Sequence, residues 1–269
     1  MSETGRLTII GAGAMGSAFA GGIISAGLVK SENLTMADVD KRMLAKASAD
    51  LACSVSTDTV AAVRGADVIM LAVKPAIVAV VLDQIGELLG ESQLVISIAA
   101  GVKLESIETA FTRHVGVVRA MPNTPCQIRA GAIGFSRGRA VTDEQAAVAK
   151  RIFDACGLSF EVPEKLLDAV TGLSGSGPAY VYVMIDALSD AGVRVGLPRD
   201  IATKLASQTV MGAAKMVIES GEHPAKLKDQ VTSPGGTTIT ALDVLERSGF
   251  RSALIEAVKA ATKRSEELA

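Results

Sequence analysis

The sequence predicts an α/β domain with a parallel sheet, followed by an all-α domain. From residue 6 to about residue 162, short apolar runs typical of strands alternate with segments of helical spacing, as a parallel sheet requires. A glycine-rich segment directly follows the first apolar run, and beyond Pro163 only helical patterns remain. We therefore expect two domains, residues 1–162 and residues 163–269.

Short apolar runs bounded by turn residues predict the strands of the first domain. Helices are expected in the gaps, for example over residues 40–49 and 104–111. Thr142 and Gln145 have the spacing of a capping box, which predicts that another helix begins there. The expected strands are Arg6–Ile10, Leu34–Ala37, Cys53–Val55, Val68–Val73, Leu94–Ile98, Gly116–Ala120 and Leu158–Val162.

The second domain has helical patterns over residues 179–191, 198–219 and 250–268. Several of these segments are apolar on most of their faces. A small helical domain has too little interior to bury all of that surface, so we expect its helices to pack against a second subunit. The sequence therefore predicts a homo-oligomer.

The segment Gly11–Gly16 has the spacing GxGxxG and stands between a strand pattern and a helical pattern. In that context Gly11 makes a tight turn, Gly13 lets a pyrophosphate approach the backbone, and Gly16 lets the helix pack closely on the strand. The first domain is therefore expected to be a Rossmann-type domain that binds a dinucleotide.

Small residues and prolines follow three further strands, at the edge where open α/β sheets bind their ligands. These segments are Ala72–Pro75, Ile98–Gly101 and Arg119–Pro125, and they allow a ribose and a nicotinamide to lie against the backbone. Lys74 either directs a hydrogen bond at the coenzyme ribose or is a solvated lysine at a strand end. Asn123 either contacts the ligand or belongs to a proline-rich turn.

Asp38 closes the second strand pattern. An acidic residue at this place binds the 2′-hydroxyl of the adenosine ribose and disfavours a 2′-phosphate, which indicates NADH. Against this interpretation, Lys41 and Arg42 could reach a 2′-phosphate from the following helix. Asp38 could also serve only as the cap of that helix.

The segment Val231–Leu242 places five hydroxyl side chains and two adjacent glycines around one proline, ahead of a helix-forming run. Glycines allow successive backbone N–H groups to face a ligand, and the N–H groups at a helix start favour an anion. The segment is therefore interpreted either as a cradle for a small carboxylate or phosphate, or as an ordinary N-cap loop.

Composition limits the expected partners and location. The formal net charge is −2 and no basic run occurs, which argues against nucleic acid. No apolar run reaches the roughly 18 residues of a membrane-spanning helix, and residues 1–5 lack the pattern of a signal peptide. Three cysteines without metal-binding spacing indicate reduced thiols, so we expect a cytoplasmic protein without a metal site.

Taken in order, these segments resemble the pyrroline-5-carboxylate reductase family over nearly the whole chain. The resemblance implies a Rossmann domain followed by a helical dimerisation domain whose helices interleave between two subunits, with dimers that assemble into a decamer. It also implies an enzyme that reduces 1-pyrroline-5-carboxylate to L-proline with NADPH or NADH, the last step of proline biosynthesis. The matching segments are Ile9–Gly13, Ala72–Pro75, Ser97–Gly101, Arg119–Pro125, Gly172–Tyr180, Gly212–Met216, Leu227–Asp229 and Val231–Leu242.

The resemblance also implies roles for individual residues. Thr238 is expected to be the catalytic residue and to hydrogen-bond the ring nitrogen of the substrate. Many members carry Asn where this chain has Ala14, and many lack an acid at the position of Asp38, which puts the family's usual NADP preference in doubt here. The residues expected to bind substrate are Ser233, Gly235, Gly236, Thr237 and Met121. Those expected to bind the coenzyme are Ile10, Gly11, Ala12, Gly13, Ala14, Met15, Asp38, Ala72, Val73, Lys74, Pro75, Ala99, Ala100, Gly101 and Asn123.

Two other functions share this two-domain plan. A β-hydroxyacid dehydrogenase reduces C=O with a catalytic lysine, for which Lys204 and Lys215 are available. A dinucleotide sensor would keep Gly11–Gly16 but would need neither Thr238 nor the carboxylate cradle. The hydroxyl-rich segment Val231–Leu242 favours the reductase over both.

Overall fold

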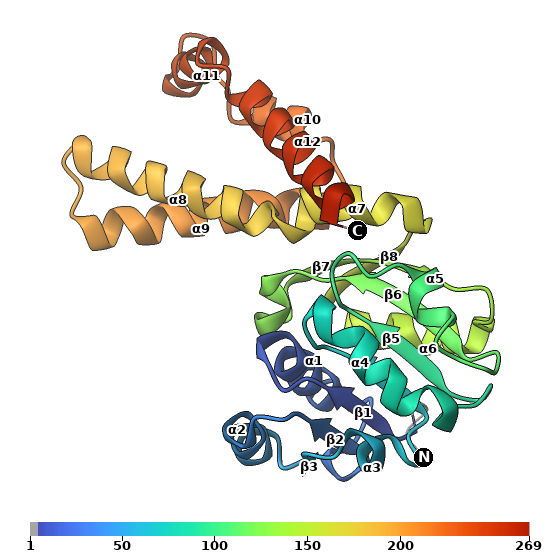
Figure 1. Ribbon diagram of the computed structural model, residues 1–269. Helices are drawn as coiled ribbons and strands as arrows, with labels where there is room; N and C mark the ends of the chain where they lie inside the picture. The colour runs from blue at the N-terminus through green and yellow to red at the C-terminus, as the bar shows by residue number, and fades with distance from the viewer. Residues whose placement is uncertain (1–4, 269) are drawn as a thin grey trace. The chain divides into compact units, whose positions relative to one another are not determined.

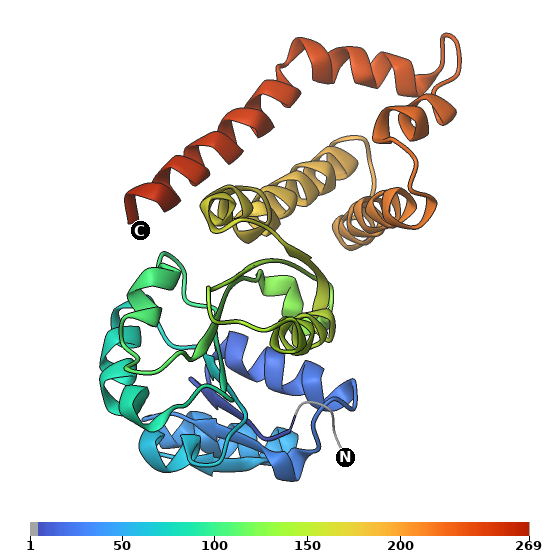
Figure 2. The same ribbon diagram turned by 90° about the vertical axis from the view of Figure 1, so that its right-hand side faces the viewer.

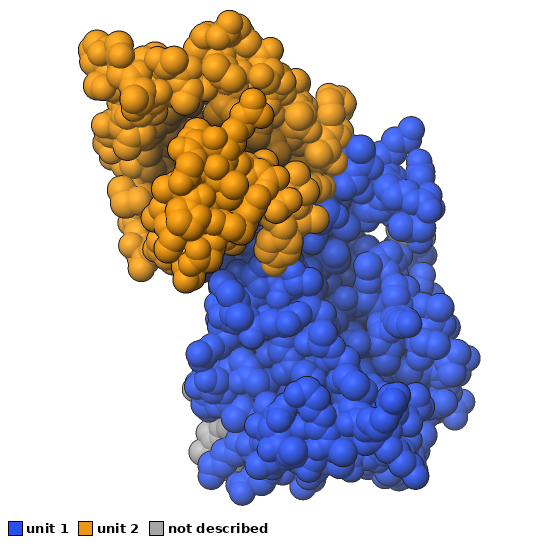
Figure 3. Space-filling model, turned by 90° about the vertical axis from the view of Figure 1, so that its left-hand side faces the viewer, with its two compact units in different colours: residues 1–176, 260–269 blue, residues 177–259 orange. Residues whose placement is uncertain are grey.

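The computed structural model describes residues 5–268. The expectation that residues 1–5 lack the pattern of a signal peptide therefore concerns residues that, apart from Gly5, lie outside the described part of the chain. The chain forms two compact units, which Figure 3 shows in different colours. Unit 1 comprises Met1–Ser176 with Ala260–Ala269, and unit 2 comprises Gly177–Lys259. These units are defined by contacts alone, and the expected domain boundary at Pro163 stays a prediction.

Unit 1 is built around one eight-stranded sheet with the order β3-β2-β1-β4-β5-β6-β7-β8 (Figure 1). Strands β1 to β6 are parallel. The order reverses between β1 and β4, and the carboxyl ends of strands at such a switch point flank the ligand crevice of open α/β sheets. The strands are β1 Leu7–Ile10, β2 Leu34–Ala37, β3 Ser54–Ser56, β4 Val68–Leu71, β5 Leu94–Ser97, β6 Gly116–Met121, β7 Gly131–Arg137 and β8 Gly157–Glu161.

Strand β7 is not among the expected strands, and it runs antiparallel to β6. Ile133 and Phe135 on β7 belong to the core, while Gly131 and Gly134 conceal the strand pattern because glycine is rare in strands. The last expected strand exists as β8, but it pairs parallel with β7 and therefore runs against β1–β6. The expectation of a wholly parallel sheet is thus wrong at this edge.

Helices cover both faces of the sheet, which explains why the central strands β1, β4 and β5 are buried along their whole length. Side chains of α1 (Ala14–Ser25), α2 (Lys41–Leu51) and α6 (Asp143–Asp154) form one core cluster with one face of the sheet. Side chains of α3 (Thr59–Val63), α4 (Pro75–Ile85) and α5 (Leu104–Glu108) form a second cluster with the opposite face.

The helix α6 begins as expected. Thr142 Oγ1 accepts from the backbone N–H of Gln145 at 3.2 Å, and Gln145 Oε1 accepts from the N–H of Thr142 at 3.1 Å. The predicted capping box is therefore confirmed. After β8, unit 1 continues through the short helix α7 (Leu167–Val170) into a π-helical turn, Thr171–Gly175.

The described residues of unit 2 form helices joined by loops, without a strand, which confirms the expected all-α second region. Helices α8 and α9 pack against each other, and Figure 2 shows α12 as one uninterrupted helix that ends at the C-terminus. No helix within residues 5–268 is long and apolar enough to cross a membrane. The helices from Gly177 onwards are α8 Gly177–Arg194, α9 Arg199–Ser220, α10 Pro224–Gln230, α11 Thr237–Arg247 and α12 Phe250–Leu268. Helix α10 was not expected, and the residues of α12 from Ala260 onwards are counted with unit 1.

Candidate functional site

Four of the predicted segments lie at one edge of the sheet. Gly11–Gly16 follows β1, Ala72–Pro75 follows β4, Ile98–Gly101 follows β5, and the residues up to Pro125 follow β6. Because these four strands are parallel neighbours, their carboxyl ends meet at the same edge. The structure thus brings together segments that are more than 100 residues apart in the sequence.

The glycine-rich loop has the geometry expected of each glycine. Gly11 has φ +111°, and a Cβ on it would lie 2.5 Å from the carbonyl oxygen of Ala72. A Cβ on Gly16 would lie 2.0 Å from the carbonyl oxygen of Gly11, whereas a Cβ on Gly13 would meet no described atom within 4 Å. Gly11 and Gly16 are therefore required by close packing, and Gly13 is open towards a ligand.

The N-terminus of α1 is suited to a pyrophosphate. Gly13 is the N-cap of this helix, and no side chain of the described residues caps it. The first N–H groups of a helix lack intrahelical acceptors and lie at the positive end of its dipole. In the absence of a capping side chain, these groups in Ala14 and Met15 remain available to an anion.

The Asp38 carboxylate is held by two backbone N–H groups. Its Oδ2 accepts from the N–H of Ala12 at 2.7 Å, and its Oδ1 accepts from the N–H of Asp40 at 2.9 Å. The side chain is half-buried directly after β2. These bonds tie the end of β2 to the glycine-rich loop and place a fixed negative charge beside it.

The helix that follows Asp38 is capped by another residue. Asp40 is the N-cap of α2, and its carboxylate accepts from the backbone N–H of Arg42, so the alternative that Asp38 is only a cap is wrong. The guanidinium of Arg42 pairs with Asp40 at 3.0 Å. Hydrogen bonding to this guanidinium holds the pKa of Asp40 below its usual value. Lys41 is exposed at the start of the helix.

Lys74 and Asn123 have different surroundings. Lys74 is the exposed N-cap residue of α4, with Pro75 in the first turn. Asn123 is 9% exposed, and its Nδ2 donates to the carbonyl of Ser174 while its Oδ1 accepts from the N–H of Ala132, each at 3.0 Å. The Asn123 side chain thus connects the loop after β6 to the π-helical turn and to β7.

Met121 ends β6 beside the π-helical turn. Its side chain is so close that a Cβ on Gly175 would lie 2.8 Å from Met121 Cε. Met121 is half-buried and is the last residue of β6, one of the four strands whose carboxyl ends meet at this sheet edge.

In unit 2, the segment after α10 forms a tight turn that leads into α11. The N–H of Gly236 donates to the carbonyl of Ser233 at 3.1 Å, and Gly235 has φ +65°. Pro234 and Gly235 occupy the two central positions, which is the arrangement of a type II turn. Gly236 is then the N-cap of α11. The expected helix start at this segment is confirmed, and the N–H of Gly236 is already bonded within the turn.

The first residues of α11 carry the hydroxyl groups that the sequence indicated. Thr237 and Thr238 lie in its first turn, and no side chain of the described residues caps this helix. The hydroxyl of Thr240 donates to the carbonyl of Gly236 at 3.1 Å, and that of Thr232 donates to the carbonyl of Lys228 at 2.7 Å. Thr232 and Thr240 are thus bonded to the backbone, and Thr238, which lies between them in the sequence, is half-buried.

The three cysteines, Cys53, Cys126 and Cys156, are buried free thiols. Burial raises the pKa of Cys156 to about 12, which keeps this thiol protonated and unreactive near neutral pH. Within residues 5–268, no group of three His, Cys, Asp or Glu side chains is arranged to hold a metal ion.

The Rossmann sheet order, the open glycine loop and the uncapped N-terminus of α1 define a dinucleotide-binding protein. The family model for NADP oxidoreductase, coenzyme F420-dependent, matches residues 6–101, and that for pyrroline-5-carboxylate reductase dimerisation matches residues 164–268. The pyrroline-5-carboxylate reductase of Methanosarcina acetivorans is 46% identical over 266 residues, covering 99% of this chain and 98% of the relative. The chain belongs to the pyrroline-5-carboxylate reductase family.

Solved structures agree with this assignment. A pyrroline-5-carboxylate reductase from Coxiella burnetii superposes with a TM-score of 0.94 at 36% identity, covering 99% of each chain. The Plasmodium falciparum pyrroline carboxylate reductase, solved with NADP bound, superposes with a TM-score of 0.88 at 35% identity and covers 100% of this chain and 99% of that one. Use of a nicotinamide coenzyme is therefore a property of the family.

The sequence does not single out one pair of side chains near the coenzyme loops. Arg119 on β6 is 6% exposed and forms an ion pair with Glu164, with 2.9 Å between Nη1 and Oε1. Arg119 lies within a family segment, but Glu164 has no sequence signal beyond its place after Pro163. Only the packing of this segment against the sheet reveals the pair.

Proposed function

We propose that this chain reduces the C=N bond of 1-pyrroline-5-carboxylate to form L-proline. The observation that carries the proposal is the start of α11, where a type II turn and an uncapped helix present backbone N–H groups beside the Thr238 hydroxyl. A cyclic imine with one carboxylate matches this set of donors, because N–H groups orient a planar carboxylate more firmly than a single lysine does. Membership of the family supports the same substrate.

In this proposal the coenzyme lies along the sheet edge where the four loops meet, and when bound it supplies a hydride to the imine carbon. The uncapped N-terminus of α1 neutralises the pyrophosphate, and the small side chains after β4 and β5 leave room for the ribose and the nicotinamide. Asn123 contributes its remaining amide N–H. The proposed coenzyme-binding residues are Ile10, Gly11, Ala12, Gly13, Ala14, Met15, Asp38, Ala72, Val73, Lys74, Pro75, Ala99, Ala100, Gly101 and Asn123.

NADH is the proposed preferred coenzyme. The Asp38 carboxylate is fixed by two backbone N–H groups, and these bonds leave its negative charge in place. A 2′-phosphate beside this carboxylate would be repelled, whereas a 2′-hydroxyl can donate a hydrogen bond to it. Arg42 offers little compensation to a phosphate because its guanidinium already pairs with Asp40.

The substrate carboxylate is assigned to Ser233, Gly235, Gly236 and Thr237, and Met121 is also proposed as a substrate-binding residue. Because the N–H of Gly236 already donates to the carbonyl of Ser233, the N–H groups of Thr237 and Thr238 are the better donors to the substrate carboxylate. Thr238 Oγ1 hydrogen-bonds the ring nitrogen, holds the imine in position and relays a proton. A protonated imine is already electrophilic, so a weakly acidic hydroxyl is sufficient.

The lysines of the dehydrogenase alternative are on the surface of α9. The Nζ atom of Lys204 lies 3.8 Å from Oδ2 of Asp200, and that of Lys215 lies 3.5 Å from Oε1 of Glu219. Each carboxylate is one turn away on the same helix. Both lysines are highly exposed. Exposed pairs of this kind are typical of a solvated helix face and do not favour a catalytic lysine.

The assembly proposed is a homodimer formed through residues 164–268, with dimers that assemble further into a decamer. The match of this segment to a dimerisation family and its exposed apolar side chains support the dimer. The decamer rests on resemblance to the family alone. The proposal that neither nucleic acid nor a membrane is a partner rests on the net charge of −2 and on a sequence without a basic run or an apolar run of membrane-spanning length. We also propose a cytoplasmic location, because three buried free thiols are typical of a reducing compartment.

The direct test is the absorbance of the reduced nicotinamide, followed with purified protein and 1-pyrroline-5-carboxylate. We expect substrate-dependent oxidation of NADH, with NADPH oxidised more slowly at equal concentration. Folded, oligomeric protein that oxidises neither coenzyme would refute the proposed reaction. Faster turnover with NADPH would leave the reaction intact and refute the role assigned to Asp38.

A further inference from the structure

The loop between β5 and α5 is held by residues outside it. This loop, Ile98–Lys103, contains Ala99, Ala100 and Gly101, which are proposed to contact the coenzyme. At its beginning, Ser97 Oγ accepts from the N–H of Ala99 over a long distance of 3.4 Å. At its end, Lys103 is the N-cap of α5 but makes no capping hydrogen bond with its side chain. Local contacts alone therefore hold the loop weakly.

The missing cap of α5 is supplied by Glu164, 60 residues further along the chain. Glu164 Oε1 accepts from the N–H of Leu104, the first residue of α5, at 2.7 Å. A carboxylate at this position satisfies a free N–H group and also stabilises the positive end of the helix dipole. Glu164 thus does for α5 what an N-cap side chain does in other helices.

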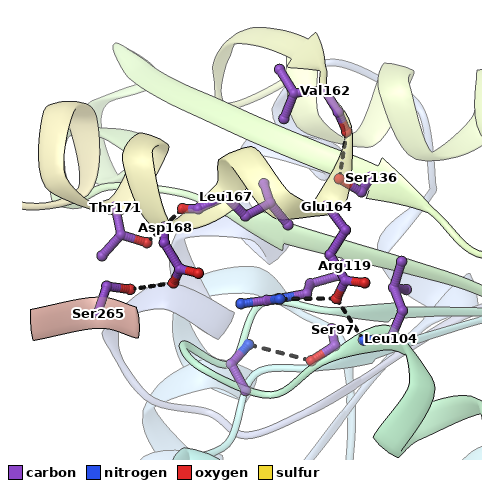
Figure 4. A network of polar contacts seen from close by, with 11 residues as sticks. Ser97, Leu104, Arg119, Ser136, Val162, Glu164, Leu167, Asp168, Thr171 and Ser265 are labelled. Carbon is purple, nitrogen blue, oxygen red and sulfur yellow. Dashed lines mark hydrogen bonds and ion pairs between the residues drawn. The ribbon is translucent and has the colours of Figure 1, made fainter. Parts of the chain in front are cut away.

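The same oxygen atom binds Arg119. Glu164 Oε1 lies 2.9 Å from Nη1 of Arg119, so it accepts two hydrogen bonds (Figure 4). Arg119 is paired in register with Ser97, the last residue of β5, and its side chain is 7% exposed. The carboxylate therefore links the end of the loop at Leu104 to a buried cation beside the start of the loop.

Breaking this arrangement would leave two buried groups without an acceptor. A buried arginine that loses its carboxylate is left as an uncompensated charge, and the N–H of Leu104 loses its bond. Arg137 and Glu161 form a comparable pair nearby, but their side chains are 38% and 39% exposed. If that pair is lost, water can solvate both partners. Neither partner is bonded to the loop Ile98–Lys103.

We propose that Glu164 is a positioning residue for the nicotinamide end of the coenzyme site, acting on the loop Ile98–Lys103 through Leu104 and Arg119. The inference rests on the proposed function insofar as that loop is taken to contact the coenzyme. Glu164 is also the first residue matched by the dimerisation family model. In this proposal the coenzyme site depends on Glu164, which lies outside the segment 6–101 that the oxidoreductase family model matches.

The test compares Glu164→Ala and Glu164→Gln with the matched control Glu161→Gln in the full-length chain. The dissociation constant of NADH is measured from the fluorescence of the bound coenzyme, and KM for 1-pyrroline-5-carboxylate is measured separately. Glu164→Ala should raise the Kd for NADH about 10-fold, because a displaced loop misplaces its contacts. Glu164→Gln keeps an oxygen for Leu104 and should raise Kd only about 3-fold, because it loses the charge-assisted bond to Arg119.

Neither Glu164 variant should change KM for the imine, and Glu161→Gln should bind NADH like the unaltered protein. A folded Glu164→Ala variant with unaltered Kd overturns the proposal, and so does an equal change in both constants. If Glu164→Ala does not fold, Glu164→Gln decides, and an unaltered Kd again overturns it. A protein that binds NADH but does not reduce the imine refutes the proposed function, whereas the comparison of Kd values still tests Glu164.

Discussion

The two compact units differ in how far they bury their apolar side chains. In unit 1, strands β1, β4 and β5 are buried at every residue. In unit 2, the described residues of α10 and α11 include no buried side chain, and those of α9 include only Ala202 and Ala206. Large apolar side chains more than half exposed in the described residues of unit 2 are Tyr182, Val183, Val195, Leu205, Met211, Met216, Ile218, Val231, Val244 and Ile255.

The difference shows what each unit requires to complete its core. A sheet with helices on both faces buries its strands within one chain. Helices arranged without a covering layer leave one side open, and an apolar surface of this extent marks an interface. Because the helical region matches a dimerisation family, a second copy of the chain is the proposed cover. Unit 1 therefore carries its own core, while unit 2 is proposed to complete its core by assembly.

The largest effect on the comparison between the two units is expected when residues 1–162 are produced alone. This fragment keeps all eight strands but lacks Glu164 and the start of α11. We expect weak dinucleotide binding and no measurable oxidation of NADH in the presence of 1-pyrroline-5-carboxylate. The full-length chain at equal concentration is the control. Detectable turnover by the fragment would show that unit 2 is dispensable for chemistry.

Thr238→Ala tests the chemistry assigned to unit 2. Removing one hydrogen bond to the ring nitrogen should lower kcat/KM about 10- to 1,000-fold while the Kd for NADH stays unaltered. Thr240→Ala is the matched control, because that hydroxyl is bonded to the carbonyl of Gly236. Near-normal turnover of Thr238→Ala would remove Thr238 from the catalytic role.

Val183→Asp tests the exposed surface of unit 2. Val183 is 71% exposed, so a charge there costs little in the single chain but is costly when a second subunit buries it. The dimer dissociation constant should rise about 100-fold, as measured by analytical ultracentrifugation. Val80→Asp, on the surface of α4 in unit 1 and 52% exposed, should leave it unaltered. Equal effects of the two substitutions would contradict the contrast between the units.

The smallest expected effect concerns the coenzyme preference set within unit 1. Asp38→Asn keeps an oxygen that can accept from Ala12 but removes the charge that repels a 2′-phosphate. The ratio of kcat/KM for NADPH to that for NADH should rise about 10-fold. Asp58→Asn is the control, because Asp58 caps α3 and is not among the proposed coenzyme contacts. An unchanged ratio in Asp38→Asn would place coenzyme selection elsewhere.

Strands and helices with strong local patterns could be predicted from the sequence. The bounds of β2 and α12 agree with expectation to the residue, because each has an uninterrupted pattern between turn residues. Strand β7 could not be found in this way, since its glycines weaken the strand pattern and its antiparallel direction depends on pairing with β6. Helix α10 is only seven residues long and gives little periodic signal.

The sequence by itself determined the alternation of strands and helices apart from β7 and α10, the glycine loop and the hydroxyl-rich helix start, because periodicity and backbone sterics act over a few neighbouring residues. Only the tertiary structure decided which polar groups far apart in the sequence meet. Asp38 accepts from a backbone N–H 26 residues away, and Glu164 from one 60 residues away. Such partners are set by strand order and by how segments pack on the sheet, and no local spacing encodes either.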